Sequence, residues 1–150
     1  MSSLATGIAA FGTLIKVGDG ASPQTFYTVA GVTDIDGPGA TVDEAETTSH
    51  STGSPHRTFI PTLIDDGEIS FPCNFDPEHA THSVTSTYGL EYLFQNRQVR
   101  AFQIHANKSD GSKQIRQFQG FVKDLGESYP VDGIQVRDVT IRITSAPSVV

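Results

Sequence analysis

Three carboxylates gather in the short stretch Asp65-Asp66-Gly67-Glu68. Paired carboxylates can perform general acid–base catalysis, and clustered carboxylates can bind calcium. The sequence lacks the calcium-loop signature, which closes with a glutamate at its twelfth position. We therefore interpret the stretch as an acidic turn before a strand, with an enzyme or metal site as the alternative.

Two histidines, His79 and His82, lie near Asp76 and Glu78. Zinc sites often use closely spaced histidine ligands. In a zinc protease helix, however, two histidines four residues apart enclose a glutamate, and the spacing here is different. No third ligand is obvious in the sequence. We expect both histidines to be solvated, in a loop or at the start of a helix, and we expect no bound metal.

Other catalytic motifs are missing. The sequence contains no Gly-x-Ser-x-Gly nucleophile motif, no phosphate-binding loop and no dinucleotide-binding fingerprint. The stretch Gly18-Asp19-Gly20 predicts only a turn. We therefore expect neither enzymatic activity nor a cofactor.

The residues after the acidic turn predict a strand. Ile69, Phe71, Cys73 and Phe75 alternate with Glu, Ser, Pro and Asn. A period of two is typical of a strand with one face in the core. Cys73 is the only cysteine, so no internal disulfide can form, and its place on the apolar face indicates a small core residue, not a nucleophile.

The rest of the chain shows seven or so short strands and one helix candidate. The last strand is expected to turn Val139, Ile141 and Ile143 inward. The helix candidate covers residues 77–98, although its first part is rich in Ser and Thr. This pattern predicts a mainly β fold, a β-sandwich or half-open barrel flanked by one α-helix. The strands are expected at residues 12–17, 26–35, 40–48, 69–75, 99–106, 114–125 and 135–144.

The chain has 150 residues, the size of one ordinary domain. We expect an N-terminal arm over residues 1–11 and a single β domain over residues 12–150. The N-terminus has no basic region typical of a signal peptide, and no window is apolar enough for a membrane helix. A stretch without hydrophobic residues, Thr47–Thr58, predicts a long polar loop, and such loops tend to be functional or disordered.

Charge is distributed unevenly along the chain. Residues 1–78 contain eleven acids and two bases, whereas residues 79–150 contain six acids and eight bases. This asymmetry is consistent with complementary surfaces on copies of one chain. The alternative is that the two halves interleave in the fold and the asymmetry averages out. The overall charge of -7 argues against general nucleic-acid binding, which needs a basic surface.

Several motifs follow one another in a fixed order: Gly12–Gly20, Thr28–Gly39, Thr47–His50, Leu63–Phe71, Asn74–Pro77, Tyr129–Gly133 and Ile143–Pro147. This ordered series resembles the major tail tube proteins of long, non-contractile-tailed phages. The resemblance implies a tail-tube-like β-sandwich, also similar to the tube protein of type VI secretion. It further implies that six copies close into a ring and that stacked rings form a hollow tube, through which DNA is delivered to the host.

The same resemblance implies partners and a location. The tube subunit would contact further copies of itself, a tail tip or initiator protein, a tape measure protein and a tail terminator. DNA would pass through the lumen without specific binding, and no membrane would be involved. The protein would belong to the virion tail and would assemble in the host cytoplasm.

Two groups of residues are candidates for these contacts. The long loop over residues 47–63 would reach a neighbouring subunit or ring, as the N-terminal arm would. A negative lumen would repel DNA phosphates, and the acidic strand faces are its candidate wall. The candidate loop residues are His50, Ser54, His56, Arg57 and Phe59, and the candidate lumen residues are Asp43, Glu46, Glu68 and Ser70.

Two alternatives stay open. A tube subunit of a phage-derived particle or secretion device would have the same sequence features. A monomeric, secreted or cell-surface β-sandwich that binds sugar or protein ligands would instead show clustered surface aromatics. The aromatics of this chain alternate into the predicted core.

Overall fold

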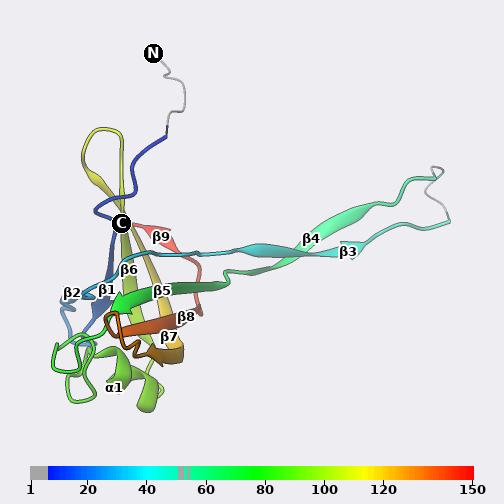
Figure 1. Ribbon diagram of the computed structural model, residues 1–150. Coiled ribbons are helices and arrows are strands. Elements are labelled where there is room, and N and C mark those ends of the chain that lie inside the picture. The colour runs from blue at the N-terminus through cyan, green and yellow to red at the C-terminus, as the bar shows by residue number, and fades with distance from the viewer. Residues whose placement is uncertain (1–6, 51–52, 54) are drawn as a thin grey trace.

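The computed structural model describes residues 7–50, 53 and 55–150. This part of the chain is mainly antiparallel β-structure with one short helix, as the sequence predicts (Figure 1). In chain order the elements are β1 (Leu14–Gly18), β2 (Phe26–Thr28), β3 (Thr41–Glu46), β4 (Phe59–Asp65), β5 (Glu68–Asn74), α1 (Leu90–Gln95), β6 (Arg100–Asn107), β7 (Lys113–Ser128), β8 (Val136–Ile143) and β9 (Ser148–Val149).

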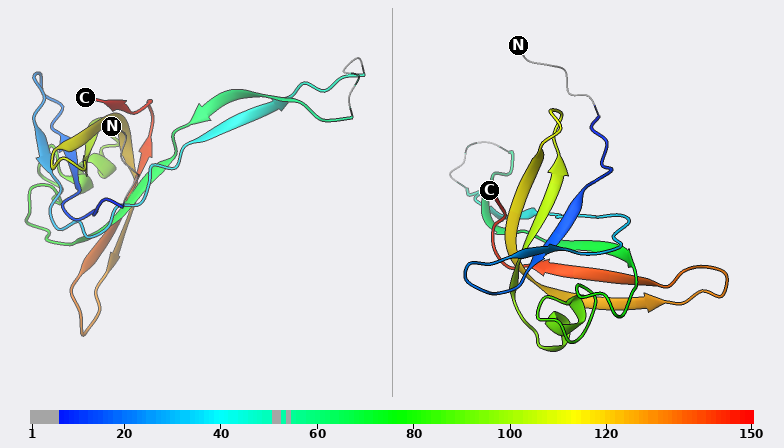
Figure 2. Two further views of the ribbon diagram at one scale, coloured as in Figure 1. Left: turned by 90° about the horizontal axis from the view of Figure 1, so that it is seen from above. Right: turned by 90° about the vertical axis from the view of Figure 1, so that its left-hand side faces the viewer.

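Strand β7 connects the two layers of the sandwich. Its first half pairs with β6 and its second half with β8, so one sheet runs in the order β2-β1-β6-β7-β8-β5. The ladder to β8 shifts register between Val122 and Asp124. A β-bulge of this kind bends a strand and increases its twist. The bend folds the sheet over itself, and Figure 2 shows the strands of the two layers crossing steeply.

The hydrophobic core fills the space between these layers. Ile15, Val17 and Phe102 enter it from β1 and β6. The predicted inward residues of β5 and β8 are confirmed, because Ile69, Phe71, Cys73, Val139, Ile141 and Ile143 are all buried. Burial raises the pKa of the Cys73 thiol to about 11, so it stays protonated at neutral pH. Cys73 is therefore a core residue, as the alternation predicts.

The helix is shorter than the sequence predicts. Residues 77–89 form successive turns, and only Leu90–Gln95 are helical, with Leu90 and Leu93 buried against the core. Side chains in the turns bond to nearby backbone groups, which competes with helix formation. Asp76 Oδ1 accepts from the N–H of Glu78 at 3.1 Å, and His79 Nδ1 accepts from the N–H of Thr81 at 3.2 Å.

The strand expected over residues 26–35 is also shorter. It ends at Thr28, and the chain then runs beside β5, where the backbone of Asp36 bonds twice to Ser70, at 2.8 and 2.9 Å. Val32 makes a further bridge to Cys73. The positive φ of Gly31 breaks the strand, and a Cβ there would lie 2.8 Å from the carbonyl oxygen of Asn74. The edge of β5 is therefore covered by residues 32–36.

A two-stranded arm leaves this sandwich. Strands β3 and β4 pair only with each other and extend far from the rest of the molecule (Figures 1 and 2). The loop predicted over residues 47–63 is therefore shorter, because Phe59–Leu63 belong to β4. The aromatic and β-branched residues after Arg57 favour an extended strand, which pairs with β3. No helix among the described residues is long and apolar enough to cross a membrane.

Candidate assembly surfaces

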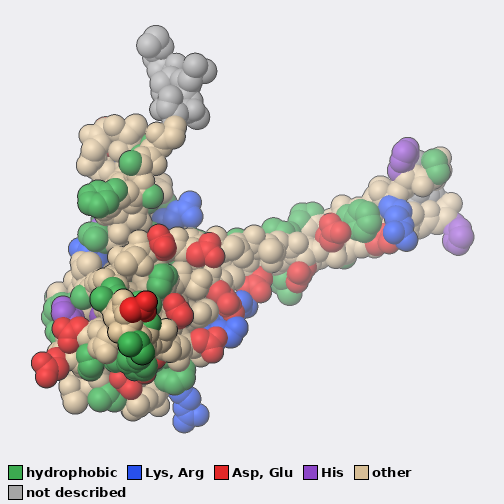
Figure 3. Space-filling view, viewed as in Figure 1, with side chains coloured by type: hydrophobic (Ala, Val, Ile, Leu, Met, Phe, Trp, Pro, Cys, Tyr) green, Lys and Arg blue, Asp and Glu red, His purple; other side chains and the backbone are tan. Residues whose placement is uncertain are grey.

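Every residue of the two arm strands is exposed. The exposed apolar side chains include Val42 at 52%, Leu63 at 75% and Ile64 at 65%. An isolated two-stranded hairpin is marginally stable in water, and contiguous exposed apolar surface marks an interaction site. Figure 3 shows hydrophobic and acidic side chains interspersed along the arm. The side chains of the arm therefore have the composition of an interaction surface.

The predicted loop residues lie at the far end of the arm. Thr47 and Thr58 close the loop, with a backbone bond of 2.8 Å and a hydroxyl contact of 2.8 Å. Beyond them, His50 and His56 are exposed. Arg57 forms an exposed ion pair with Glu46 at 3.6 Å, and Phe59 begins β4 at 47% exposure. The prediction for Ser54 lies outside the described residues.

A tight turn fixes the base of the arm. Asp65 Oδ1 accepts from the N–H of Gly67 at 2.9 Å and from Arg142 Nη2 at 2.9 Å. The backbone hydrogen bond from Gly67, and then the bond from Arg142, lower the pKa of Asp65. Gly67 has a φ of 80°, and a Cβ there would lie 2.3 Å from the carbonyl oxygen of Gly39. The predicted acidic turn is thus a tightly held connection between β4 and β5.

An acidic face lies on the outer side of β5, β8 and the second half of β7. The register places Ser70 opposite Thr140 and Thr140 opposite Asp124. Asp138 follows on the same side of β8, two residues before Thr140. Asp34 and Asp36 reach this side from the segment beside β5 and line a groove of 230 Å³ together with Ser70 and Asp138. We call these residues the acidic face: Asp34, Asp36, Ser70, Asp124, Asp138 and Thr140.

Ion pairs bound the acidic face at the end near the arm. Lys123 Nζ donates to Glu68 Oε1 at 2.5 Å, and Arg142 pairs with Asp65. The bond to Glu68 raises the pKa of Lys123. Among the described residues, no cation pairs with the carboxylates of Asp124 or Asp138. The carboxylates at the end near the arm are therefore neutralised by ion pairs, whereas Asp124 and Asp138 keep the rest of the face negative.

The structure separates the four residues predicted to face a lumen. Glu68 and Ser70 lie on the outer side of β5, where Ser70 belongs to the acidic face and Glu68 lies next to it. Asp43 and Glu46 lie on β3 in the arm, away from that face. Sequence alternation correctly separated the two sides of β5. It did not find Asp124 and Asp138, because their grouping depends on the β7–β8 register.

The start of the described chain is tied to the β6–β7 hairpin. Asn107 Nδ2 donates to the carbonyl oxygens of Ala9 and Phe11, at 2.8 and 2.7 Å. Lys113 Nζ donates to the carbonyl oxygen of Gly12 at 2.6 Å. Phe11 itself is 96% exposed. Residues 7–12 thus have a fixed base and an exposed aromatic side chain.

Part of one edge of β7 has no strand partner among the described residues. Strand β6 pairs with β7 only as far as Gly120, whereas β7 continues to Ser128 along β8. No strand of the described residues pairs with the other edge of β7 between residues 121 and 128. An unpaired edge offers backbone donors and acceptors to another chain.

The prediction that both histidines are solvated is wrong for His82, whose exposure is 0%. Its Nε2 donates to the carbonyl oxygen of Ala30 at 2.8 Å, while Nδ1 accepts from the N–H of Asp76 at 3.2 Å. This pairing requires the neutral ring. Burial lowers the pKa of His82. The polar Thr and Ser residues around it in the sequence concealed its place in the core.

A buried arginine lies next to this histidine, and sequence reasoning missed it. Arg137 is 1% exposed and donates to Glu127 at 2.6 Å and to the carbonyl oxygen of His82 at 3.1 Å. Its guanidinium lies 3.9 Å from the ring centre of Phe75. Its position, two residues before Val139, placed it on the inward side, so the alternation alone could have identified it. No group of three or more His, Cys, Asp or Glu among the described residues could hold a metal ion.

Comparison with known proteins identifies the fold. No family model and no curated protein matches the sequence. A chain from the tail of an empty gene transfer agent (GTA) particle, refined with C6 symmetry, aligns with a TM-score of 0.67 at 16% identity, covering 91% of this chain and 94% of that chain. A chain from the SPP1 tail tube aligns with a TM-score of 0.64 at 11% identity, covering 90% and 76%.

A third similar chain belongs to the PVC sheath/tube terminator of an extracellular contractile injection system. It aligns with a TM-score of 0.68 at 13% identity and covers 98% of this chain and 99% of that chain. The chain has a tail tube fold. This confirms the fold that the ordered sequence motifs imply, and it relates the tail tube fold of this chain to components of both phage tails and injection systems.

Proposed function

We propose that this chain is a structural subunit that self-assembles into stacked hexameric rings and forms a hollow tail tube. The observation that carries the proposal is the nearly full-length similarity to a chain from a GTA tail refined with C6 symmetry. Fold similarity alone does not transfer a function, so the surfaces must support it independently. Three surfaces of this chain do so.

The first surface is the open edge of β7. Ring closure would pair residues 121–128 with a strand of the next copy, and it would remove the exposed edge. A head-to-tail contact of this kind repeats around a ring until it closes. At the other end of the sheet, residues 32–36 already cover the edge of β5. Another copy would therefore have to pair with this segment instead of with β5.

The second surface is the arm. Its exposed apolar side chains become buried if the arm lies against a neighbouring subunit or ring. In this assignment the tip residues His50, His56, Arg57 and Phe59 make inter-subunit contacts, and Asp43 and Glu46 support the arm instead of lining a lumen. The exposed Phe11 and the segment before it serve the same purpose at the N-terminus.

The third surface is the acidic face, which we assign to the lumen together with Glu68. Carboxylates along the wall repel DNA phosphates, so DNA slides past without specific binding. The chain then acts without enzymatic activity or a cofactor, in the tail of a virion that delivers DNA to its host. Its partners would be further copies, a tail tip or initiator, a tape measure protein and a terminator, and assembly would occur in the host cytoplasm.

A second candidate is a tube subunit of a phage-derived particle or secretion device. The similarity to a chain of a contractile injection system favours this possibility. A secretion device differs from a phage tail in its cargo, so nucleic acid inside purified native particles supports a phage or phage-derived particle, and its absence supports the secretion device.

Negative-stain electron microscopy of the purified protein at high concentration tests the proposal. Six-fold rings or hollow tubes are the expected result. Particles that remain monomeric at every concentration and ionic strength would overturn it and would favour the monomeric ligand-binding sandwich.

A further inference from the structure

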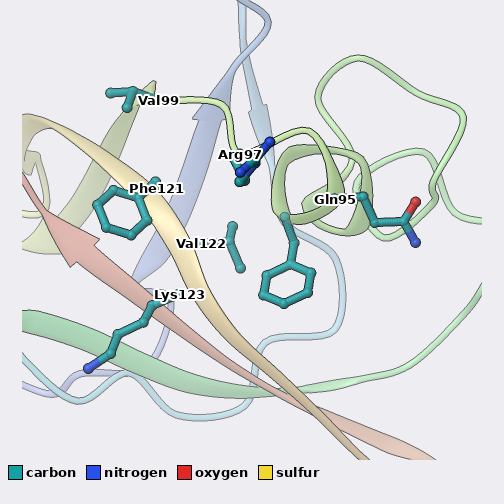
Figure 4. A pocket seen from close by; sticks show the side chains of 7 residues that line it. Gln95, Arg97, Val99, Phe121, Val122 and Lys123 are labelled. Carbon is teal, nitrogen blue, oxygen red and sulfur yellow. The ribbon is translucent and has the colours of Figure 1, made fainter.

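An apolar pocket of 610 Å³ opens between the C-terminal end of α1 and strand β7. Figure 4 shows Phe121 and Lys123 on β7 and Arg97 just after the helix. Phe94 and Val99 also line the pocket and are 39% and 49% exposed. Its lining contains two cations and no carboxylate. Lys123 already pairs with Glu68, so Arg97 is the lining cation without an ion-pair partner among the described residues. The pocket therefore suits an occupant that is both apolar and negatively charged.

Arg97 ends the helix in an unusual conformation. Its φ is 52°, in the left-handed region, and it is the one non-glycine residue with positive φ in the described chain. The N–H of Gln98 donates to Leu93 at 3.1 Å and the N–H of Arg97 to Phe94 at 3.3 Å, which is a Schellman ending. Glycine normally occupies this position because a Cβ is disfavoured there.

The Arg97 side chain makes no hydrogen bond or ion pair with the described residues. Arginine at this position, which favours glycine, therefore makes no hydrogen bond or ion pair with the described residues that would stabilise the fold. Strained residues that the fold does not need tend to occur at functional sites. The position of Arg97 at the rim of an apolar pocket indicates a role in binding.

One face of the arm has the complementary chemistry. Alternate residues of β3 point to the same side, and the ladder places each beside a residue of β4. Glu46 on this face pairs with Arg57, whereas Glu44 has no ion-pair partner among the described residues. We call these residues the docking face: Val42, Glu44, Glu46, Phe59, Pro61 and Ile64.

We propose that the docking face of one copy binds the pocket beside α1 of a second copy, with Glu44 against Arg97. This inference rests on the proposed function and identifies the surface that receives the arm. We call the pocket beside α1 the socket. Glu44 on the docking face and Arg97 in the pocket both lack an ion-pair partner among the described residues, and their charges are opposite.

The arm cannot fill its own pocket. The arm projects away from the sandwich (Figure 1), whereas the pocket lies on the sandwich between the end of α1 and β7. The contact must therefore join two copies through different surfaces. Such a heterologous contact repeats from copy to copy, as a ring or a filament requires.

A charge exchange tests the pairing. In the wild-type background, Glu44→Arg and Arg97→Glu are each expected to abolish the tubes that sediment in an ultracentrifuge, because like charges then meet in the socket. The double variant is expected to recover at least half of the sedimenting protein. Circular dichroism and thermal melting of each soluble variant show that the fold is intact.

Arg97→Gly separates binding from stability. We expect its Tm to be unchanged or higher than that of the wild type, because glycine relieves the left-handed conformation, while tube formation falls at least tenfold. Arg97→Lys keeps the positive charge and is the matched control, with most of the assembly retained. A variant that loses both stability and assembly would assign Arg97 a structural role and overturn the inference.

A cysteine pair gives direct evidence of contact. Glu44→Cys with Arg97→Cys is expected to yield a ladder of disulfide-linked multimers, while the buried Cys73 stays unreactive. Tubes that form normally from Glu44→Arg, or a cysteine pair that never links within tubes, overturn the socket while the proposed function stands. A wild-type protein that never assembles overturns the proposed function itself.

Discussion

Arg137 of β8 and Glu127 of β7 face each other across the ladder and form a 2.6 Å ion pair, although the arginine is 1% exposed. The guanidinium also contacts Glu91 at 3.4 Å, so it links the strands to the helix. Because Arg137 bonds to the carbonyl oxygen of His82 as well, it joins the second layer to the turns before α1. The buried cation therefore holds the helix and its preceding turns on the sandwich.

We expect Arg137→Ala to destabilise the monomer strongly. Removing one partner of a buried ion pair costs about 3 kcal/mol or more, since the remaining polar groups lose their partner. The two glutamates are about one-third exposed, which places the expected loss at the lower end of that range. Urea denaturation measures the free energy of unfolding.

Arg142→Ala is the matched control for this prediction. Arg142 lies on the same strand and pairs with Asp65, but both side chains are partly exposed. Removing an exposed pair costs about 0–1 kcal/mol. Equal losses in the two variants would show that the buried position of Arg137 is not what matters.

Acidification is expected to destabilise the fold through His82. Burial lowers the pKa of His82 below its ordinary value of 6.5, and the neighbouring His79 and Arg137 act in the same direction. The unfolded chain therefore binds a proton more readily than the folded one. The contribution to stability is complete above pH 6.5 and is lost as the pH falls from there through the folded pKa.

Urea midpoints measured across this pH range test the prediction. His82→Gln removes the titrating ring and should flatten the decline. His105 also has a lowered pKa, because of burial and the nearby Lys16 and Lys113, so His105→Gln serves as the comparison. His105 is less buried, and we expect its removal to have the smaller effect. An unchanged decline in His82→Gln would contradict the prediction.

Gly67→Ala is expected to weaken the base of the arm. Gly67 has a φ of 80°, and the added Cβ would lie 2.3 Å from the backbone oxygen of Gly39. Gly111→Ala is the matched control, because Gly111 has a φ of 88° but open space around it. The backbone conformation alone costs about 1 kcal/mol in both variants, so the excess in Gly67→Ala measures the clash. Equal urea midpoints of Gly67→Ala and Gly111→Ala would show that the turn accommodates the added Cβ with no loss of stability.

The sequence predicted the sandwich because the local patterns agree with the fold. Strict alternation in 69–73 and 139–143 identified core faces that the structure confirms, whereas Phe75 is only half-buried beyond the end of β5. The patterns could not show that β7 bends at its bulge, because that depends on pairing with two different strands. As a result, the grouping of Asp124 with Ser70 across β8 could be seen only in the structure.

The sequence also predicted the candidate contact residues only in part. Absence of hydrophobic residues in 47–58 located the tip of the arm, but the apolar residues after it were placed in the loop. Exposed β4 residues have the composition of a buried strand, and only the paired structure shows that none of the described residues covers them. The socket residue Arg97 carried no sequence signal, because its conformation depends on where the helix ends.

Removing the tip of the arm is expected to block assembly and leave the monomer folded. The deletion replaces residues 49–57 by an Asn-Gly turn between Thr48 and Thr58, and the contacts of Thr47 with Thr58 favour closure there. Because the described residues of the tip are exposed, the Tm of the monomer should change by less than about 2 °C. Electron microscopy should show monomers only. Intact tubes from this variant would contradict an inter-subunit role for the tip.

Reversing one charge of the acidic face is expected to make assembled tubes retain DNA. Asp138→Lys places a cation where the proposed lumen wall has no paired base, and it should retain DNA that wild-type tubes release. Glu68→Lys tests the same assignment less directly, because Glu68 already pairs with Lys123. Asp132→Lys, on the β7–β8 turn, makes the same charge change away from the face. Nuclease protection of DNA that sediments with the tubes is the measurement. The retained fraction should fall steeply with added salt. Equal protection by Asp138→Lys and Asp132→Lys would show that the acidic face does not line the channel.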